Sequence, residues 1–194
     1  MYNELKSFQE KHMNKSVKKI MDSYLYLVDL HNSLEISVSD ITNVAGVSRA
    51  TFYNHFNSVG DVISCIEESV DAKILECINN HPNGVTKGIG IIDVISNEIL
   101  PLIYENREIL KILYTSPLQP YWIDYLKANY SKWVSSFKSE YDCRTVPSYY
   151  AENLTYLFFF SIIELWVSKP VPETPAEFMK IFHSLFSVPI SQLL

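Results

Sequence analysis

The side chains of this sequence best suited to specific recognition lie close together just after position 48. Arg49 can present two donors to a guanine edge, and Asn54 can pair with adenine in a similar bidentate manner. Beside them, Ala50 and the Thr51 methyl group can contact a thymine methyl. On a single helix, these groups have the chemistry needed to read base edges in the major groove of DNA; the alternative is an ordinary solvated helix face.

Other polar side chains nearby are better suited to the DNA backbone than to bases. Tyr53 and His55 can donate to phosphate oxygens, which fixes register without reading sequence. Ser37 and Ser39 are most simply helix caps, with phosphate contact as a possible second role. The predicted DNA-contacting set is Ser37, Ser39, Ser48, Arg49, Ala50, Thr51, Tyr53, Asn54 and His55.

Closely spaced start and stop signals define the elements that must position these side chains. Ser37 and Asp40 have the spacing of a capping box, and Gly46 can end the short helix that this box opens. Ser48 then predicts a second short helix, and Ser58 predicts the start of a long one. Two short helices joined by a glycine turn have the dimensions of a helix-turn-helix.

Helical periodicity dominates the whole chain, and no segment has a convincing strand pattern. We expect an all-α protein of about nine helices, with an N-terminal three-helix helix-turn-helix domain followed by a C-terminal helical domain. Pro101 is expected to kink a helix over residues 86–105. One further helix is expected before the helix-turn-helix, over residues 15–32. The remaining expected helices lie in the C-terminal domain and span 107–114, 121–141, 149–168 and 175–187.

Charge and composition limit where a polyanion could bind. The 194 residues contain 16 Lys and Arg against 22 Asp and Glu, a formal net charge of −6. Residues 1–57 contain six of each sign, so the deficit lies entirely in the remainder. A nucleic-acid site is therefore expected in the first third of the chain.

Several classes of protein are disfavoured. The polar start and three cysteines without close spacing (Cys65, Cys77 and Cys143) indicate a reduced, cytoplasmic protein, whose thiols we interpret as structural rather than redox-sensing. The most apolar run, Leu154–Val167, is too short to cross a membrane. No catalytic constellation can be assembled, and no histidine pair has a metal-binding spacing on one helix. We expect no enzyme, no cofactor and no metal.

The segment VSDITNVAGVSRATFYNHFNSVGDVI, within residues 16–66, resembles the DNA-binding domain of the TetR family of bacterial transcriptional regulators. The likeness rests on Ile41, the run Ala45–Ser48, Thr51–Tyr53, His55–Phe56 and Ser58. Glu105–Glu108 and Trp166 followed by Thr174–Glu177 resemble a subset found in Gram-positive bacteria.

This resemblance implies a homodimer that binds a double-stranded DNA operator and is released by a small-molecule effector. It divides the chain into an extension (1–14), a helix-turn-helix domain (15–60) and a ligand-binding and dimerisation domain (61–194). The family usually dimerises through its last two long helices, and the apolar 149–168 helix also needs cover on more than one side. The predicted interface residues are Tyr156, Phe159, Phe160, Ile163, Trp166, Phe178 and Phe182.

Aromatic residues of the middle helices are candidates for the effector pocket, because tyrosine hydroxyls can orient a ligand between apolar walls. Ordinary core packing is the alternative for each of them. The candidates are Tyr104, Tyr114, Trp122, Tyr125 and Trp133.

Two departures from the family pattern favour a second hypothesis. Val59 stands where the family commonly has a phosphate-binding lysine, and Asn57 stands where a basic residue is frequent. We therefore expect few phosphate contacts and a modest salt dependence. The alternative function is a co-regulator that keeps the fold, binds a protein partner and has little intrinsic affinity for DNA.

Overall fold

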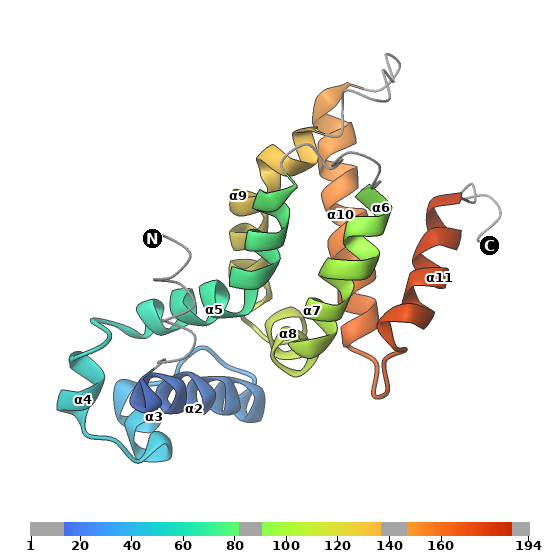
Figure 1. The fold of residues 1–194 in the computed structure, drawn as a ribbon. Helices are drawn as coiled ribbons and strands as arrows, with labels where there is room; N and C mark the ends of the chain where they lie inside the picture. Colours follow the sequence, from blue (N-terminus) through green and yellow to red (C-terminus); the bar gives the residue numbers. More distant parts are fainter. Residues whose placement is uncertain (1–13, 82–90, 137–146, 188–194) are drawn as a thin grey trace. The chain divides into compact units, whose positions relative to one another are not determined.

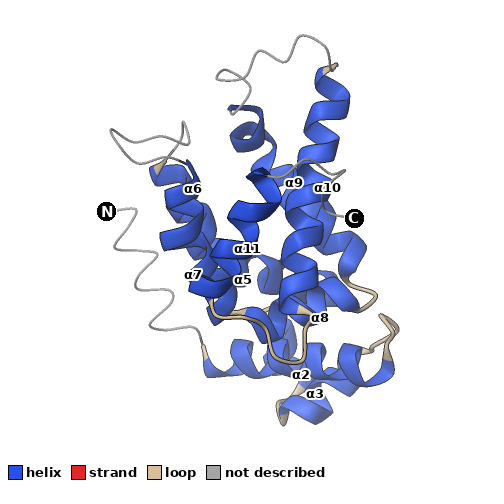
Figure 2. Ribbon diagram, turned by 90° about the vertical axis from the view of Figure 1, so that its right-hand side faces the viewer, coloured by secondary structure: helices blue, strands red, loops and turns tan. Residues whose placement is uncertain are grey.

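The computed structural model describes residues 14–81, 91–136 and 147–187, and all regular structure in these ranges is helical (Figure 2). The chain forms two compact units, Met1–Ser69 and Val70–Leu194. They divide within the continuous helix α5 (Val59–Asn80), whereas the predicted domain boundary follows residue 60. The first turns of α5 belong to the first unit, where Val62 and Ile66 are buried.

The first unit is a three-helix bundle completed by the start of α5 (Figure 1). Its helices are α2 (Lys15–His31), α3 (Val38–Ala45) and α4 (Arg49–Tyr53). Ile20, Tyr24, Val28, Ile41 and Phe52 are all completely buried, so each of the three helices contributes to one core. The expected helix over residues 15–32 is confirmed to within one residue.

The predicted capping signals around α3 are present as hydrogen bonds. The Asp40 backbone N–H donates to Ser37 Oγ at 3.2 Å, and the Ser37 backbone N–H donates to Asp40 Oδ2 at 2.9 Å. Gly46 ends α3 in the left-handed conformation, with φ of 63°. A residue with a Cβ adopts this conformation at a cost, which explains glycine at the turn.

The second unit begins with the rest of α5 and continues through a helical rod of three parts: α6 (Ile91–Val94), the π-helical segment η1 (Ile95–Ile99) and α7 (Leu100–Glu105). The Leu100 backbone N–H donates to the Ile95 carbonyl, a bond that spans five residues. Pro101 follows at once and lacks a backbone N–H. Pro101 was expected to kink this helix; the structure has a π-helical turn, Ile95–Ile99, just before Pro101.

Four further helices complete the second unit: α8 (Arg107–Thr115), α9 (Gln119–Ser136), α10 (Ser148–Val167) and α11 (Pro175–Ser187). Helix α10 packs against α8 and α9, and α11 packs against α7 and η1. The predicted cap of α11 is present, since the Thr174 hydroxyl and backbone N–H both donate to the Glu177 carboxylate. With α6, η1 and α7 counted as one rod, the described residues form nine helices and no strand, which confirms the all-α prediction.

Candidate nucleic-acid interface and ligand cavity

Helix α4 is held rigidly by its own first turn and by the core beneath it. Ser48 caps the helix, because its Oγ accepts a hydrogen bond from the Thr51 backbone N–H at 3.0 Å. The Ser48 and Thr51 hydroxyls also lie 2.8 Å apart. On the inner side, the ring of Phe52 is fully buried and contacts the ring of Phe56 at 5.7 Å between centroids. The outer side of α4 is thereby fixed in orientation.

The outer side of α4 and the two residues that follow it carry most of the predicted DNA-contacting residues, and their accessibility is compatible with that role. Arg49, Ala50, Tyr53, Asn54 and His55 are exposed. The Tyr53 ring packs edge-on against the buried Phe52 ring, with 5.5 Å between centroids. Tyr53 is nevertheless 49% exposed. Of the remaining predicted residues, Ser37 and Ser48 are exposed, and Ser39 and Thr51 are half-buried.

His55 has a partner from the start of the first unit. The Asn14 side-chain nitrogen lies 3.3 Å from His55 Nε2, while Asn14 Oδ1 accepts a hydrogen bond from the Ser16 backbone N–H. This second bond fixes the orientation of the Asn14 amide, so its nitrogen donates to His55. A neutral His55 ring then carries its proton on Nδ1, which remains available as a donor.

The start of α5 is less able to bind a DNA phosphate than most helix N-termini are. Asp61 Oδ2 accepts from the backbone N–H of Asn57 at 2.7 Å, and the Asp61 backbone N–H donates to Ser58 Oγ at 3.2 Å. The bonds from Asn57 and Ser58 hold the pKa of the Asp61 carboxyl below its ordinary value. A charged carboxylate and occupied N–H groups therefore stand beside Val59, where the family commonly has a lysine.

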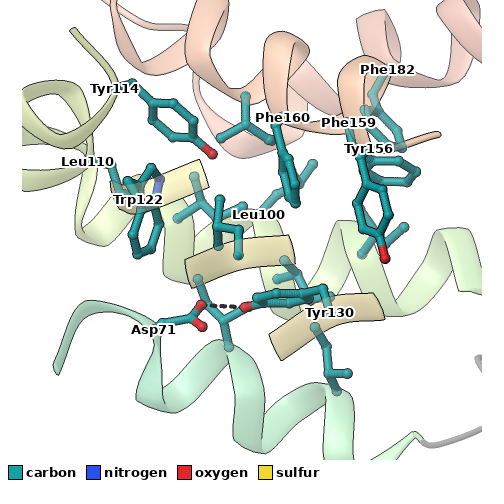
Figure 3. A pocket seen from close by; sticks show the side chains of 17 residues that line it. Asp71, Leu100, Leu110, Tyr114, Trp122, Tyr130, Tyr156, Phe159, Phe160 and Phe182 are labelled. Atoms are coloured by element: carbon teal, nitrogen blue, oxygen red, sulfur yellow. Dashed lines mark hydrogen bonds between the residues drawn. The ribbon is translucent and has the colours of Figure 1, made fainter. Parts of the chain in front are cut away.

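A cavity of about 90 Å³ lies inside the second unit (Figure 3). That volume is several times the roughly 10–15 Å³ that one water molecule requires on this measure. Its walls are almost entirely aliphatic and aromatic side chains. Phe159, Phe160 and Phe182 lie on one side in Figure 3, and Asp71 and Tyr130 lie on the other.

The predicted pocket residues fall into three groups. Tyr114 and Trp122 line the cavity as expected. Tyr104 and Tyr125 do not line it: Tyr104 stacks on Trp166 with 5.8 Å between ring centroids, and Tyr125 stacks on Trp122 at 5.5 Å. The side chain of Trp133 lies outside the described residues.

The polar pair Asp71 and Tyr130 was not predicted. The Tyr130 hydroxyl donates to Asp71 Oδ1, and both residues are buried. Burial raises the pKa of the Asp71 carboxyl to about 6, although hydrogen bonding from Tyr130 and Tyr125 opposes the rise. The second carboxylate oxygen, Oδ2, is buried without a hydrogen-bond partner among the described residues. It is a buried acceptor at the wall of an apolar cavity.

Five of the seven predicted dimer-interface residues are buried within the chain, and Phe159 and Phe160 are half-buried. Trp166 and Phe178 are nearly completely buried and stack with 4.0 Å between ring centroids. The other five predicted residues line the cavity: Tyr156, Phe159, Phe160, Ile163 and Phe182. Because α10 is apolar nearly all round, its sequence does not distinguish the side that faces its own chain from the side that faces solvent.

A different set of apolar side chains is exposed on the last two helices. On α10 these are Leu154, Leu157 and Leu165, each at least 59% exposed, and on α11 Ile181 is 41% exposed. Leu154, Leu157 and Leu165 recur at spacings that place them along one stripe of α10. This stripe is a further candidate contact surface, beside the residues predicted from the sequence.

In the part of the chain that the structure describes, no helix is both long enough and apolar enough to cross a lipid bilayer. No protein-family model matches the sequence, and no curated protein matches it significantly.

The fold does match solved structures of two transcriptional regulators. The fatty acid degradation regulator FadR from Bacillus halodurans matches 90% of this chain and 96% of its own, with a TM-score of 0.64 and 18% identity. The TetR transcriptional regulator from Streptococcus agalactiae 2603V matches 92% and 97%, with a TM-score of 0.54 and 16% identity. The chain therefore shares the helical fold of these two regulators.

Proposed function

We propose that this chain is a TetR-family transcriptional repressor, which binds a near-palindromic operator as a homodimer and is released by a small, mainly apolar effector. The observation that carries the proposal is the helix-turn-helix of α3 and α4, whose outer side exposes Arg49, Tyr53, Asn54 and His55 over a buried Phe52. A likeness in fold to two transcriptional regulators supports the same class.

In this proposal, α4 enters the major groove and each exposed side chain has a separate task. Arg49 reads guanine, Asn54 reads adenine, and Ala50 with the Thr51 methyl contacts thymine. Tyr53 and the Nδ1–H of His55 bind phosphates and fix the position of the helix. Val59 and Asn57 stand where basic residues are common in the family, so we expect phosphate contacts to be fewer than in a strongly basic reader.

Dimerisation is assigned to the exposed stripe of α10, Leu154, Leu157 and Leu165, together with Ile181 of α11. Apolar side chains exposed along one line of a helix are stabilised when a second copy covers them. A two-fold dimer presents two reading helices to half-sites about one DNA turn apart.

The effector is assigned to the cavity of the second unit. Its aromatic and aliphatic walls fit an apolar body, and Asp71 Oδ2 offers a single buried acceptor. Above pH 6 this carboxylate is largely ionised and disfavours a second carboxylate nearby. The effector therefore presents a hydrogen-bond donor, such as a hydroxyl or amino group, to Asp71.

DNA recognition is tested by selection from fragmented genomic DNA of the source cell, using the full chain and moderate salt. The proposal predicts enrichment of a few fragments that share a near-palindromic sequence. Enrichment of no sequence would instead favour the co-regulator hypothesis, in which the fold serves contact with a protein.

Effector binding is tested by thermal unfolding in the presence of alcohols, amines and carboxylic acids with the same apolar body. The alcohol or amine is expected to raise the unfolding temperature of the wild-type protein more than the matched acid does. Equal or greater stabilisation by the acid would contradict the role given to Asp71.

A further inference from the structure

Three potential metal ligands meet where the end of α5 faces η1, within the second unit. Cys77 lies in the last turn of α5, and His81 is the first residue after the helix ends at Asn80, four positions further on. Glu98 comes from η1, and its carboxylate lies 3.3 Å from Cys77 Sγ (Oε2) and 3.6 Å from His81 Nε2 (Oε1). One ligand atom from each of the three residues lies within 4.8 Å of the others.

The histidine is already oriented as a metal ligand would be. His81 Nδ1 lies 2.9 Å from the backbone carbonyl oxygen of Cys77, to which it donates as a neutral ring. Its other nitrogen, Nε2, is then an acceptor and faces the Glu98 carboxylate. Metal-binding histidines characteristically donate their second ring N–H to such a carbonyl or carboxylate, which fixes the tautomer and the ring orientation.

The π-helical segment explains how Glu98 reaches this position. In η1, Ile95 and Ile99 line the cavity, while Glu98 contacts α5 instead of the cavity. A π-helical turn shifts the register of side chains relative to an ordinary α-helix, and such turns are frequent at functional sites. Cys77 is 7% exposed, and the side chain of His81 is 13% exposed. The side chain of Glu98 is 44% exposed, which leaves an entry path from solvent.

We propose that Cys77, His81 and Glu98 form a binding site for a divalent transition-metal ion, best suited to Zn²⁺. One sulfur, one imidazole nitrogen and one carboxylate oxygen form a ligand set that Zn²⁺ accepts in tetrahedral sites. Ordinary Zn–S, Zn–N and Zn–O bonds place sulfur and oxygen about 3.6 Å apart, and nitrogen and oxygen about 3.4 Å apart. The observed 3.3 Å (Sγ to Oε2) and 3.6 Å (Nε2 to Oε1) end on the two different oxygens of the Glu98 carboxylate, so this carboxylate must rotate for one oxygen to reach both separations.

Metal binding replaces the hydrogen bonds within the cluster. Without metal, the Cys77 thiol donates to Glu98 Oε2, and burial with this carboxylate raises the pKa of the thiol to about 12. On binding, Sγ, Nε2 and one Glu98 oxygen each donate an electron pair to the ion. The S–H bond breaks, its proton leaves to solvent, and no group is oxidised or reduced. Water completes the fourth position on the exposed side.

The site would lie directly behind one wall of the cavity. Ile78 follows Cys77 and Ile99 follows Glu98, and both isoleucines line the cavity. A bound ion would fix α5 to η1 and hold these two wall residues in place. Metal would thus bind in the same unit as the effector but at a different site. This proposal does not depend on whether the chain binds DNA.

The test titrates Co²⁺, and then Zn²⁺, into the full-length chain with Cys65→Ser and Cys143→Ser, so that Cys77 is the single remaining thiol. The expected result is one Co²⁺ per chain with a thiolate-to-metal charge-transfer band in the near ultraviolet, which Zn²⁺ removes by displacement. Cys77→Ser should abolish the band. Glu98→Gln and His81→Gln should weaken binding at least about 100-fold, because even partners outside the ligand shell typically contribute 10–100-fold.

His31→Gln serves as the matched control for His81, since His31 is exposed at the end of α2 and should leave metal binding unchanged. Glu98→Gln keeps the size of an exposed side chain, so unchanged circular dichroism is expected and the loss of affinity can be assigned to the ligand atom. Absence of the charge-transfer band, or equal Co²⁺ affinity in the wild-type and Glu98→Gln chains, would overturn the proposal.

Discussion

Tyr130 donates its hydroxyl hydrogen to Asp71 inside the apolar cavity of the second unit (Figure 3). The bond satisfies one carboxylate oxygen and leaves the other as a buried acceptor. Burial destabilises the ionised form of this carboxyl group, and the hydrogen bonding from Tyr130 and Tyr125 offsets only part of that cost. Its presence in a wall that could have been wholly apolar is the strongest reason to assign the cavity to a ligand.

The Asp71 carboxyl should make stability depend on pH. Its pKa is raised from an ordinary 3.8 to about 6 in the folded chain, so its favourable contribution is complete below pH 3.8 and is lost as pH rises through 6. The full effect is roughly 3 kcal/mol, of which about half falls between pH 5 and pH 8. Urea unfolding at these two pH values should show that Asp71→Asn removes this loss.

Asp124→Asn is the control for that measurement, because Asp124 is exposed on α9. It should keep the wild-type difference between pH 5 and pH 8. If Asp71→Asn also keeps the whole wild-type difference, the buried carboxylate does not titrate as described.

The glycine turn between α3 and α4 should be sensitive to a single methyl group. Gly46→Ala is expected to destabilise the fold by about 1–2 kcal/mol, since φ of 63° is unfavourable for alanine although nothing lies within 4 Å of the added Cβ. Gly60→Ala, in the first turn of α5, should instead stabilise by about 0.5–1 kcal/mol. Thermal unfolding of both variants measures the contrast; equal effects would argue against backbone conformation as the cause.

Dimerisation should depend on the exposed side of α10. Leu157→Glu is expected to convert the dimer to a monomer, because it places a charge in the proposed apolar contact. Leu30→Glu on α2 is the matched control, since Leu30 and Leu157 are 58% and 59% exposed. Sedimentation velocity should find the control dimeric, and a dimeric Leu157→Glu chain would exclude this surface.

Arg49 should contribute specificity rather than general affinity. Arg49→Ala is expected to weaken binding to a selected operator by roughly 1–3 kcal/mol and to relax the preference at one base pair. Lys127→Ala removes an exposed cation from α9 and should change neither property. Competition binding with single-base variants of the operator measures both effects; unchanged specificity after Arg49→Ala would remove Arg49 from base reading.

Local signals made the first unit largely predictable. The bounds of α2 and α3, the capping box of Ser37 and Asp40, and the left-handed Gly46 depend on residues within a few positions of each other. The exposed side of α4 follows equally well, because Phe52 marks its inner side. A pattern of this length specifies both the elements and their packing.

The cavity and the contact surface were harder to predict, because they depend on which sides of several helices face inward. Asp71 and Tyr130 are 59 positions apart, and no local pattern pairs them. Helix α10 is apolar on nearly every side, and four of the five interface residues predicted on it line the cavity. Only the three-dimensional packing shows that Phe160 lines the cavity whereas Leu157 is exposed.

The metal ligands show a signal that sequence reasoning overlooked. Cys77 and His81 have the four-residue spacing that brings two side chains to one side of a helical turn, but the sequence analysis compared cysteines only with cysteines and histidines only with histidines. Glu98 could not have been added from the sequence, because its position depends on the π-helical register of η1. Two of the three ligands were therefore within reach of the sequence.

The central claim is that the chain reads a DNA sequence, and fluorescence polarisation tests it most directly. The purified full-length chain is titrated into a duplex of the selected near-palindromic sequence and into a scrambled duplex, at two salt concentrations with competitor DNA. The account predicts saturable binding at least about 10³-fold tighter to the selected duplex, with a shallow decrease at the higher salt. Equal, weak binding to both duplexes that disappears at the higher salt would contradict it.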